Sequence, residues 1–146
     1  MDYGIVIEKI HQELKAYWGK GKVADYIPAL AGVEPKRYGI AIETLDGHSF
    51  QVGDADIRFS IQSISKVFAL AMVTRHLGDR IWKFVGREPS GNPFNSLVQL
   101  EYEHGIPRNP FINAGALVVT DRLMSLYEQP KDAILQFVRS ICGNLL

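Results

Sequence analysis

The sequence predicts an α+β fold with an amino-terminal helix, a β-hairpin and then helices only. Apolar residues recur at helical spacing through residues 3–18, two strand-like segments flank an Asp-Gly pair, and helical spacing returns after residue 63. The pattern contains no third strand to complete a sheet, and a two-stranded hairpin is only marginally stable by itself. We therefore expect part of an antiparallel sheet followed by a helical region.

The first helix is expected over residues 3–18. Gly19 and Gly21 follow it and are typical residues at a helix end. Residues 24–30 are expected to form a second short helix or turn, with Pro28 inside it. The apolar residues of the first helix repeat at spacings of three and four, which places them on one face: Tyr3, Ile7, Ile10, Leu14 and Tyr17.

Residues 38–52 are predicted to form a β-hairpin. The segments 38–45 and 48–52 are rich in apolar and β-branched residues, and Asp46 and Gly47 lie between them. Such a pair is the strongest short-range hairpin signal, since a two-residue turn of this kind requires a positive φ at both central residues. We expect the two segments to pair as antiparallel strands.

The rest of the chain is expected to be helical around one long loop. Residues 63–77 are apolar on nearly all sides, which is typical of a buried central helix, and Gly78 ends it. Residues 85–95 contain two glycines, two prolines and two asparagines and should form a long structured loop. A largely buried helix follows Asn113, and a last helix spans residues 130–143 between a proline and a glycine.

Composition narrows the class of protein. The 146 residues carry 16 basic and 16 acidic side chains, so no net field favours nucleic acid or an anionic membrane as a partner. The longest apolar run, residues 67–73, is too short to cross a bilayer, and the start lacks the basic segment of a signal peptide. The single Cys142 favours a reducing compartment, and the four histidines show no metal-ligand spacing. We expect a cytoplasmic protein without a metal.

Ser63 and Lys66 form an S-x-x-K motif, which is the strongest chemical signal in the sequence. Residues three apart on a helix share a face, so the lysine can lie beside the serine hydroxyl. A serine becomes a nucleophile when a base takes its proton, and a lysine can be that base where burial lowers its pKa. We therefore interpret Ser63 as a candidate nucleophile and Lys66 as its base.

A structural interpretation competes with the catalytic one. Because the motif often arises by chance, Ser63 could be a helix N-cap and Lys66 a surface residue. Ser60 and Ser65 are weaker nucleophile candidates. Ser60 lies six residues from Lys66, and Ser65 is its immediate neighbour and points elsewhere.

Other polar residues allow two interpretations each. Asn113 is either the N-cap of the helix that follows it or an amide that binds a polar substrate. Tyr26 is either a core aromatic residue or a hydrogen-bond donor in a pocket. Arg87 and Glu88 in the long loop are expected to be a structural ion pair or solvated charges.

Four segments together resemble the bacterial and mitochondrial glutaminases. They occur in that family's order and spacing, and the resemblance runs from about residue 3 to residue 143. The segments are residues 24–28 (ADYIP), 59–66 (FSIQSISK), 85–95 (VGREPSGNPFN) and 109–116 (NPFINAGA).

The resemblance implies a fold similar to serine β-lactamases and penicillin-binding proteins. It also implies hydrolysis of L-glutamine to L-glutamate and ammonia through a glutamyl ester on Ser63, with Lys66 as the base. Ser63, Asn113 and Tyr26 match substrate-binding residues of the family. No metal or organic cofactor is implied, and the full-length form is expected to be a homo-oligomer, a tetramer or a dimer.

Length is the main departure from the family. Residues 1–146 match only the amino-terminal portion of a glutaminase domain, so the resemblance implies further substrate-binding residues, an oxyanion-hole amide and more strands elsewhere. Because the loss of one oxyanion donor can cost about 10² in rate, we expect the isolated chain to be essentially inactive. A truncated, non-catalytic assembly partner of full-length glutaminase is one alternative. A β-lactamase-type acyl-serine hydrolase is less favoured, since the sequence lacks a Lys-Thr-Gly strand.

Overall fold

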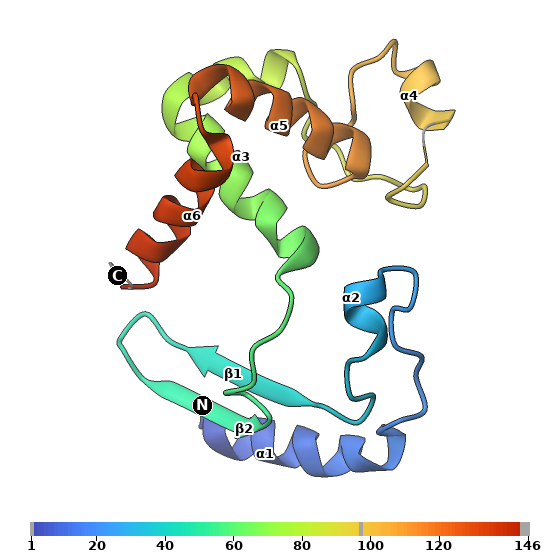
Figure 1. The fold of residues 1–146 in the computed structure, drawn as a ribbon, viewed down its shortest axis with the longest axis vertical. Helices are drawn as coiled ribbons and strands as arrows, with labels where there is room; N and C mark the ends of the chain where they lie inside the picture. Colours follow the sequence, from blue (N-terminus) through green and yellow to red (C-terminus); the bar gives the residue numbers. More distant parts are fainter. Residues whose placement is uncertain (1, 97, 144–146) are drawn as a thin grey trace. The chain divides into compact units, whose positions relative to one another are not determined.

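The computed structural model of the protein describes residues 2–96 and 98–143, which fall into two compact units. The first unit comprises residues 1–59 and the second residues 60–146. Figure 1 shows the elements of each unit along the chain. The amino-terminal unit contains α1 (Tyr3–Leu14), the 3₁₀ turn η1 (Lys15–Tyr17), α2 (Pro28–Ala31), β1 (Gly39–Glu43) and β2 (Ser49–Gly53).

The predicted first helix is confirmed over most of its length. It begins after Asp2, whose side chain accepts a hydrogen bond from the Ile5 amide over 3.1 Å, and it tightens into a 3₁₀ turn after Leu14. The short helix predicted over residues 24–30 begins only at Pro28. Proline has no N–H to donate and is therefore tolerated in the first turn of a helix but not inside it.

Helix α1 packs against the hairpin and forms the small core of the first unit. Ile7 at the centre of the predicted apolar face is 2% exposed, and His11 on the next turn is also buried. The His11 ring contacts Trp18 and Tyr38, with ring centroids 5.1 and 5.7 Å away. At the end of the helical segment Tyr17 is 64% exposed, so the apolar face is buried mainly at its centre.

The predicted hairpin is confirmed as an antiparallel pair of strands, and the two strands form the whole sheet among the described residues. Ile40 pairs with Val52 and Ile42 with Phe50. These four side chains are half-buried, whereas the residues between them are exposed. The alternation gives the sheet one apolar face, as expected for a half-buried strand pair.

The connection between the strands differs from the predicted two-residue turn. The Gly47 amide donates to the Thr44 carbonyl over 3.0 Å, and the Thr44 amide donates to the His48 carbonyl over 2.9 Å. Gly47 has a φ of 83°, whereas Asp46 is not among the described residues with positive φ. A side chain makes the left-handed region costly, so the chain uses a longer turn that needs only the glycine there.

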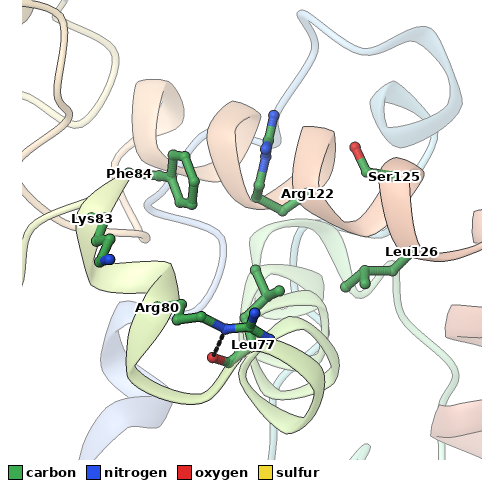
Figure 2. Close-up of a pocket in the computed structure, with 7 residues that line it drawn as sticks. All are labelled: Leu77, Arg80, Lys83, Phe84, Arg122, Ser125 and Leu126. Atoms are coloured by element: carbon green, nitrogen blue, oxygen red, sulfur yellow. Dashed lines mark hydrogen bonds between the residues drawn. The ribbon is translucent and has the colours of Figure 1, made fainter.

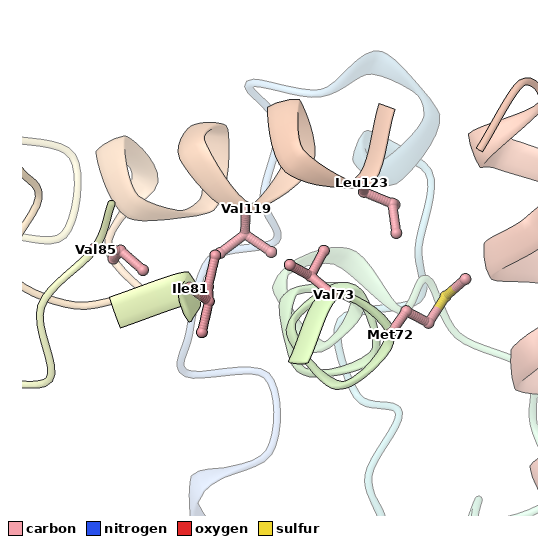
Figure 3. Packing of buried hydrophobic residues seen from close by; sticks show 6 residues of the cluster. All are labelled: Met72, Val73, Ile81, Val85, Val119 and Leu123. Carbon is pink, nitrogen blue, oxygen red and sulfur yellow. The ribbon is translucent and has the colours of Figure 1, made fainter. Parts of the chain in front are cut away.

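The second unit is helical and has one compact core. Helix α3 packs against α5, α6 and the 3₁₀ segment η3. Figure 3 shows the buried cluster between them, formed by Met72, Val73, Ile81, Val85, Val119 and Leu123. The elements are η2 (Gln62–Ile64), α3 (Ser65–Leu77), η3 (Gly78–Lys83), α4 (Val98–Tyr102), α5 (Asn113–Leu126) and α6 (Pro130–Ile141).

The predictions that α3 is a buried central helix and that α5 is largely buried are wrong. Met72 and Val73 of α3 are buried, but Val67 on the same helix is 52% exposed. On α5, Leu123 is 1% exposed and Leu117 is 69% exposed. Within the second unit the neighbours of each helix cover only part of its surface, so an all-round apolar sequence is buried on that part alone.

The remaining expectations for this unit hold. The long loop over residues 85–95 contains no helix or strand, and the last helix begins at Pro130. Gly143 follows that helix with a φ of 70°, as expected of a helix-ending glycine. The short helix α4 was not predicted. Among the described residues, no helix has the length and apolar character needed to span a membrane.

Candidate functional site

Ser63 lies in the 3₁₀ turn η2, immediately before α3, and is exposed. The residue before it, Gln62, has a φ of 40°, which is unusual for a residue with a side chain. The Ser65 hydroxyl donates to the Gln62 carbonyl over 2.6 Å and holds this turn. The N-cap of α3 is Ile64, so the interpretation of Ser63 as its N-cap is wrong. The turn presents Ser63 next to a strained backbone, a feature that clusters at functional sites.

Lys66 lies in the first turn of α3 and is half-buried. Its Nζ atom donates to the Phe111 carbonyl over 2.9 Å and to the Asn113 Oδ1 atom over 2.8 Å. The same atom lies 5.9 Å from the centroid of the Phe94 ring. The alternative of a solvated surface lysine is therefore wrong. Among the described residues Lys66 forms no ion pair, so neutral oxygens hold its amine.

This arrangement suits an amine that works as a base. A neutral lysine amine has two N–H bonds and one lone pair. The Phe111 carbonyl oxygen and the Asn113 amide oxygen can each accept a hydrogen bond from one of these N–H groups. The lone pair then remains available in a third direction. Among the described residues no hydrogen bond joins Ser63 to Lys66. Catalytic hydrogen bonds are often long without substrate and tighten when it binds.

Asn113 is the first residue of α5, and the N-cap is Ile112. The Asn113 side chain makes no capping bond, so the N-cap interpretation is wrong, and its Oδ1 atom accepts from Lys66 instead. The Asn113 backbone amide donates to the Phe94 carbonyl over 2.9 Å. Its side-chain nitrogen makes no hydrogen bond with another described residue, so this donor can serve a polar ligand.

The long loop over residues 85–95 is held against the segment that leads into α5. The Gly86 amide donates to the Pro107 carbonyl over 2.8 Å, and the Glu88 amide donates to the Arg108 carbonyl over 3.0 Å. A Cβ atom on Gly86 would lie 2.5 Å from the Arg108 carbonyl oxygen. The two segments can approach this closely only because residue 86 is a glycine.

Asn109 fixes the backbone that supplies the acceptors for Lys66, and sequence reasoning missed it. Its side-chain nitrogen donates to the Glu88 carbonyl over 2.9 Å. Its Oδ1 atom accepts from the amides of Phe111 and Ile112 over 3.0 and 3.1 Å. An asparagine before a proline is a known turn-forming signal, which could have identified this residue.

The other polar candidates have other partners or belong to the amino-terminal unit. Arg87 lies over the Trp82 ring, 5.3 Å from its centroid, and no ion pair joins it to Glu88 among the described residues. Tyr26 belongs to the amino-terminal unit and is 76% exposed there, so its interpretation as a core aromatic is wrong. Among residues 2–96 and 98–143 no group of histidine, cysteine, aspartate and glutamate side chains is placed to hold a metal.

Comparisons with known proteins agree on one family. The family model described as "Glutaminase" matches residues 21–146. The "Glutaminase" of Marinomonas sp. (strain MWYL1) is 56% identical over 139 residues, which are 95% of this chain and 46% of that protein. The "Glutaminase" of Salmonella arizonae is 58% identical over 139 residues, which are 94% of this chain and 45% of that protein. The chain thus spans less than half the length of these curated relatives.

Solved structures give the same result for the fold. A structure described as probable glutaminase ybaS superposes with a TM-score of 0.75 at 38% identity, covering 82% of this chain and 39% of that one. A probable glutaminase of Bacillus subtilis superposes with a TM-score of 0.68 at 28% identity, covering 87% and 41%. These neighbours confirm the predicted fold class, an α+β chain that forms part of a β-lactamase-like fold.

Proposed function

The chain belongs to the glutaminase family, and from this premise we propose that it supplies the nucleophile and the base for hydrolysis of L-glutamine to L-glutamate and ammonia. One observation carries the proposal. The Lys66 amine, one turn after Ser63, is held by two neutral oxygens, those of Phe111 and Asn113, rather than by a carboxylate. Both oxygens belong to the segment that leads into α5 and to its first residue, so the fold of the second unit holds this amine in place in the helix turn that follows Ser63.

The reaction follows the chemistry of acyl transfer. The Ser63 hydroxyl attacks the side-chain amide carbon of glutamine, and Lys66 takes the hydroxyl proton. The tetrahedral intermediate collapses as the C–N bond breaks, and the proton passes to the leaving nitrogen, which departs as ammonia. Water then attacks the glutamyl ester while Lys66 takes a proton from it. Lys66 passes this proton to the Ser63 oxygen as the ester C–O bond breaks and glutamate leaves. The serine and lysine end in their starting forms, and no metal or organic cofactor enters the cycle.

Asn113 and Tyr26 are proposed to bind the substrate. The Asn113 side-chain nitrogen, which has no partner among the described residues, is a donor suited to a carboxylate or carbonyl oxygen of glutamine. The Tyr26 side chain is 76% exposed and can offer its hydroxyl to a ligand. We also propose a cytoplasmic setting, which the single, free and exposed Cys142 supports. A homo-oligomeric full-length form rests on the family resemblance alone, and no nucleic-acid or membrane partner is proposed.

A chimera tests this function. The 139 residues of this chain that align with the Marinomonas relative replace the matching part of that protein, and ammonia release from glutamine is measured. We expect the chimera to be active, and we expect Ser63→Ala and Lys66→Met each to lower kcat by at least about a thousand-fold. Ser60→Ala is the matched control and should leave kcat unchanged. A chimera whose activity survives Ser63→Ala would disprove the assignment.

Trapping the glutamyl ester tests whether Ser63 is the nucleophile. Glutamine is mixed with the active chimera, the reaction is quenched in acid, and the peptide containing Ser63 is analysed by mass spectrometry. We expect added mass equal to one glutamyl group on Ser63, and none in the Ser63→Ala variant. Modification of Ser60 or Ser65 instead would assign the nucleophile to a different serine.

A further inference from the structure

A cavity of about 300 Å³ lies in the second unit at the end of α3 remote from Lys66. Figure 2 shows the side chains around it, which come from α3, from the segment that follows it and from the last turns of α5. Leu77 on α3 is 11 residues beyond Lys66, which is about 16 Å along a helix. The cavity is therefore separate from the candidate site.

Its lining combines an apolar part with positive charge. Leu77, Phe84 and Leu126 provide the apolar part. Arg80, Lys83 and Arg122 provide three cationic side chains, and Ser125 adds a hydroxyl. None of the lining residues is acidic.

The three cationic side chains differ in how many partners they have. Arg122 is paired with Asp121, and its guanidinium carbon lies 4.9 Å from the centroid of the Phe84 ring. Arg80 donates from Nε to the Leu77 carbonyl over 3.2 Å and from a terminal nitrogen to the His76 carbonyl over 3.4 Å, and its guanidinium keeps further N–H groups for another acceptor. Lys83 is exposed and forms no ion pair or hydrogen bond with another described residue. The lining thus keeps an excess of positive charge beside an apolar surface.

We propose that this cavity binds a small free carboxylate with a hydrocarbon tail. The charge excess at Lys83 and Arg80 favours an anionic head, and the surface of Leu77, Phe84 and Leu126 favours an apolar body. A volume of about 300 Å³ is at the lower end of the range for ligand pockets, so it suits a small ligand. Octanoate has this size and this combination of groups.

Four probes of matched size or charge test the proposal on the 146-residue chain. Octanoate carries the tail and the negative charge, acetate only the charge, 1-octanol only the tail, and octylammonium the tail with the opposite charge. Binding is followed by NMR through the methyl groups of Leu77 and Leu126. We expect saturable shifts with octanoate at a Kd of about 1 mM or tighter. Each of the other three probes should bind at least about ten-fold more weakly.

Two variants locate the head group. Lys83→Gln should weaken octanoate binding by about ten-fold, because it removes a charge that has no other described partner. Lys83 is exposed, so this change should not disturb folding. Lys131→Gln, an exposed cation on α6 outside the cavity, is the control and should leave the Kd unchanged.

Several outcomes would overturn the proposal. Absence of saturable methyl shifts with octanoate would show that the cavity does not take this ligand. If 1-octanol or octylammonium bound as tightly as octanoate, the cations would not contribute to binding. If acetate bound as tightly as octanoate, the apolar surface would not contribute. An unchanged Kd in Lys83→Gln would place the carboxylate elsewhere.

Discussion

The Asn109 side chain forms hydrogen bonds with three backbone groups. It donates to the Glu88 carbonyl and accepts from the amides of Phe111 and Ile112. The Phe111 carbonyl in turn accepts from Lys66. Asn109 is thus a positioning residue, which acts on the candidate base through the backbone that it holds.

Replacing Asn109 should loosen this segment. Asn109→Ala leaves the Phe111 and Ile112 amides without their acceptor, so we expect a loss of about 1–3 kcal/mol in the free energy of unfolding. Asn109→Asp keeps the acceptor and should lose less. Asn95→Ala, at an exposed position of the long loop, is the control. Denaturant unfolding measures all three, and equal stability of Asn109→Ala and Asn95→Ala would contradict this role.

The hairpin turn contains the one carboxyl group with a clear shift among the described residues. A hydrogen bond from the Thr44 hydroxyl, and then one from His48, hold the pKa of Asp46 below its ordinary value of 3.8. Because the folded pKa is lowered, these contacts stabilise the hairpin above pH 3.8. Their contribution is lost as the pH falls through the lowered folded pKa.

Thr44→Val should therefore move the titration of Asp46 upward. The variant keeps the β-branched shape but removes the hydroxyl that is the larger cause of the shift. NMR of the Asp46 carboxyl carbon across the acid range measures the change. We expect the pKa to rise toward 3.8, and the acid-dependent part of the stability to shrink with it. A titration curve identical to that of the parent chain would show that the hydroxyl has no such role.

The candidate site could be predicted from the sequence only in part. Ser63 and Lys66 are three residues apart, so periodicity alone suggests that they are neighbours. The acceptors for Lys66 lie 45 and 47 residues further along the chain, and local patterns carry no information about such partners. For the same reason the sequence left Asn113 open between a cap and a substrate-binding residue, and only the fold shows that its side chain is not the cap.

At the scale of elements, α5 depends on a close approach that only glycine permits. A Cβ atom on Gly115 would lie 1.8 Å from the Asn109 carbonyl oxygen. Alanine usually stabilises a helix by about 1 kcal/mol relative to glycine, and here the sign should reverse. Gly115→Ala should lower the free energy of unfolding by roughly 2 kcal/mol or more, because backbone atoms must move.

Gly91→Ala is the matched control for this change. Gly91 lies in the long loop and does not have a positive φ, and a Cβ atom added there would meet no other atom within 4 Å among the described residues. Its replacement should be neutral or slightly stabilising. Thermal unfolding compares the two variants, and a Gly115→Ala chain as stable as its parent would mean that the segment before α5 yields easily.

The burial of α5 on one side leads to a second prediction about this helix. Leu123 is 1% exposed in the core, and Leu117 on the same helix is 69% exposed. Leu123→Ala should cost about 2–5 kcal/mol through lost burial and a cavity, whereas Leu117→Ala should cost under about 0.5 kcal/mol. Denaturant unfolding measures both. Similar losses would indicate that Leu117 is covered in solution, as predicted for a largely buried helix.

The elements themselves could be predicted where a local signal is strong. The hairpin follows from its Asp-Gly pair, and α6 from its opening proline. The turn type was missed, because the signal fixes the place of a turn better than its length. The burial of α3 and α5 was missed because an apolar sequence shows what a helix can bury, whereas exposure depends on which neighbours are present.

At the scale of the whole molecule, length governs what the chain can do alone. It spans less than half of the Marinomonas and Salmonella relatives that it matches. We expect the 146 residues by themselves to release ammonia from glutamine no faster than their own Ser63→Ala variant, since more than half of the length of these relatives has no match in this chain. A colorimetric ammonia assay on both proteins checks this. Turnover at the rate of the chimera would show that these residues suffice.

The contacts of Lys66 also limit how this position can vary in nature. An arginine keeps the positive charge, but its planar group does not place one nitrogen between the oxygens of Phe111 and Asn113, and it does not lose its proton in proteins. The most conservative replacement by charge would therefore be as damaging to the proposed chemistry as removal of the side chain. Under the proposed mechanism, a homologous protein with arginine at this position would keep its fold and lack the activity.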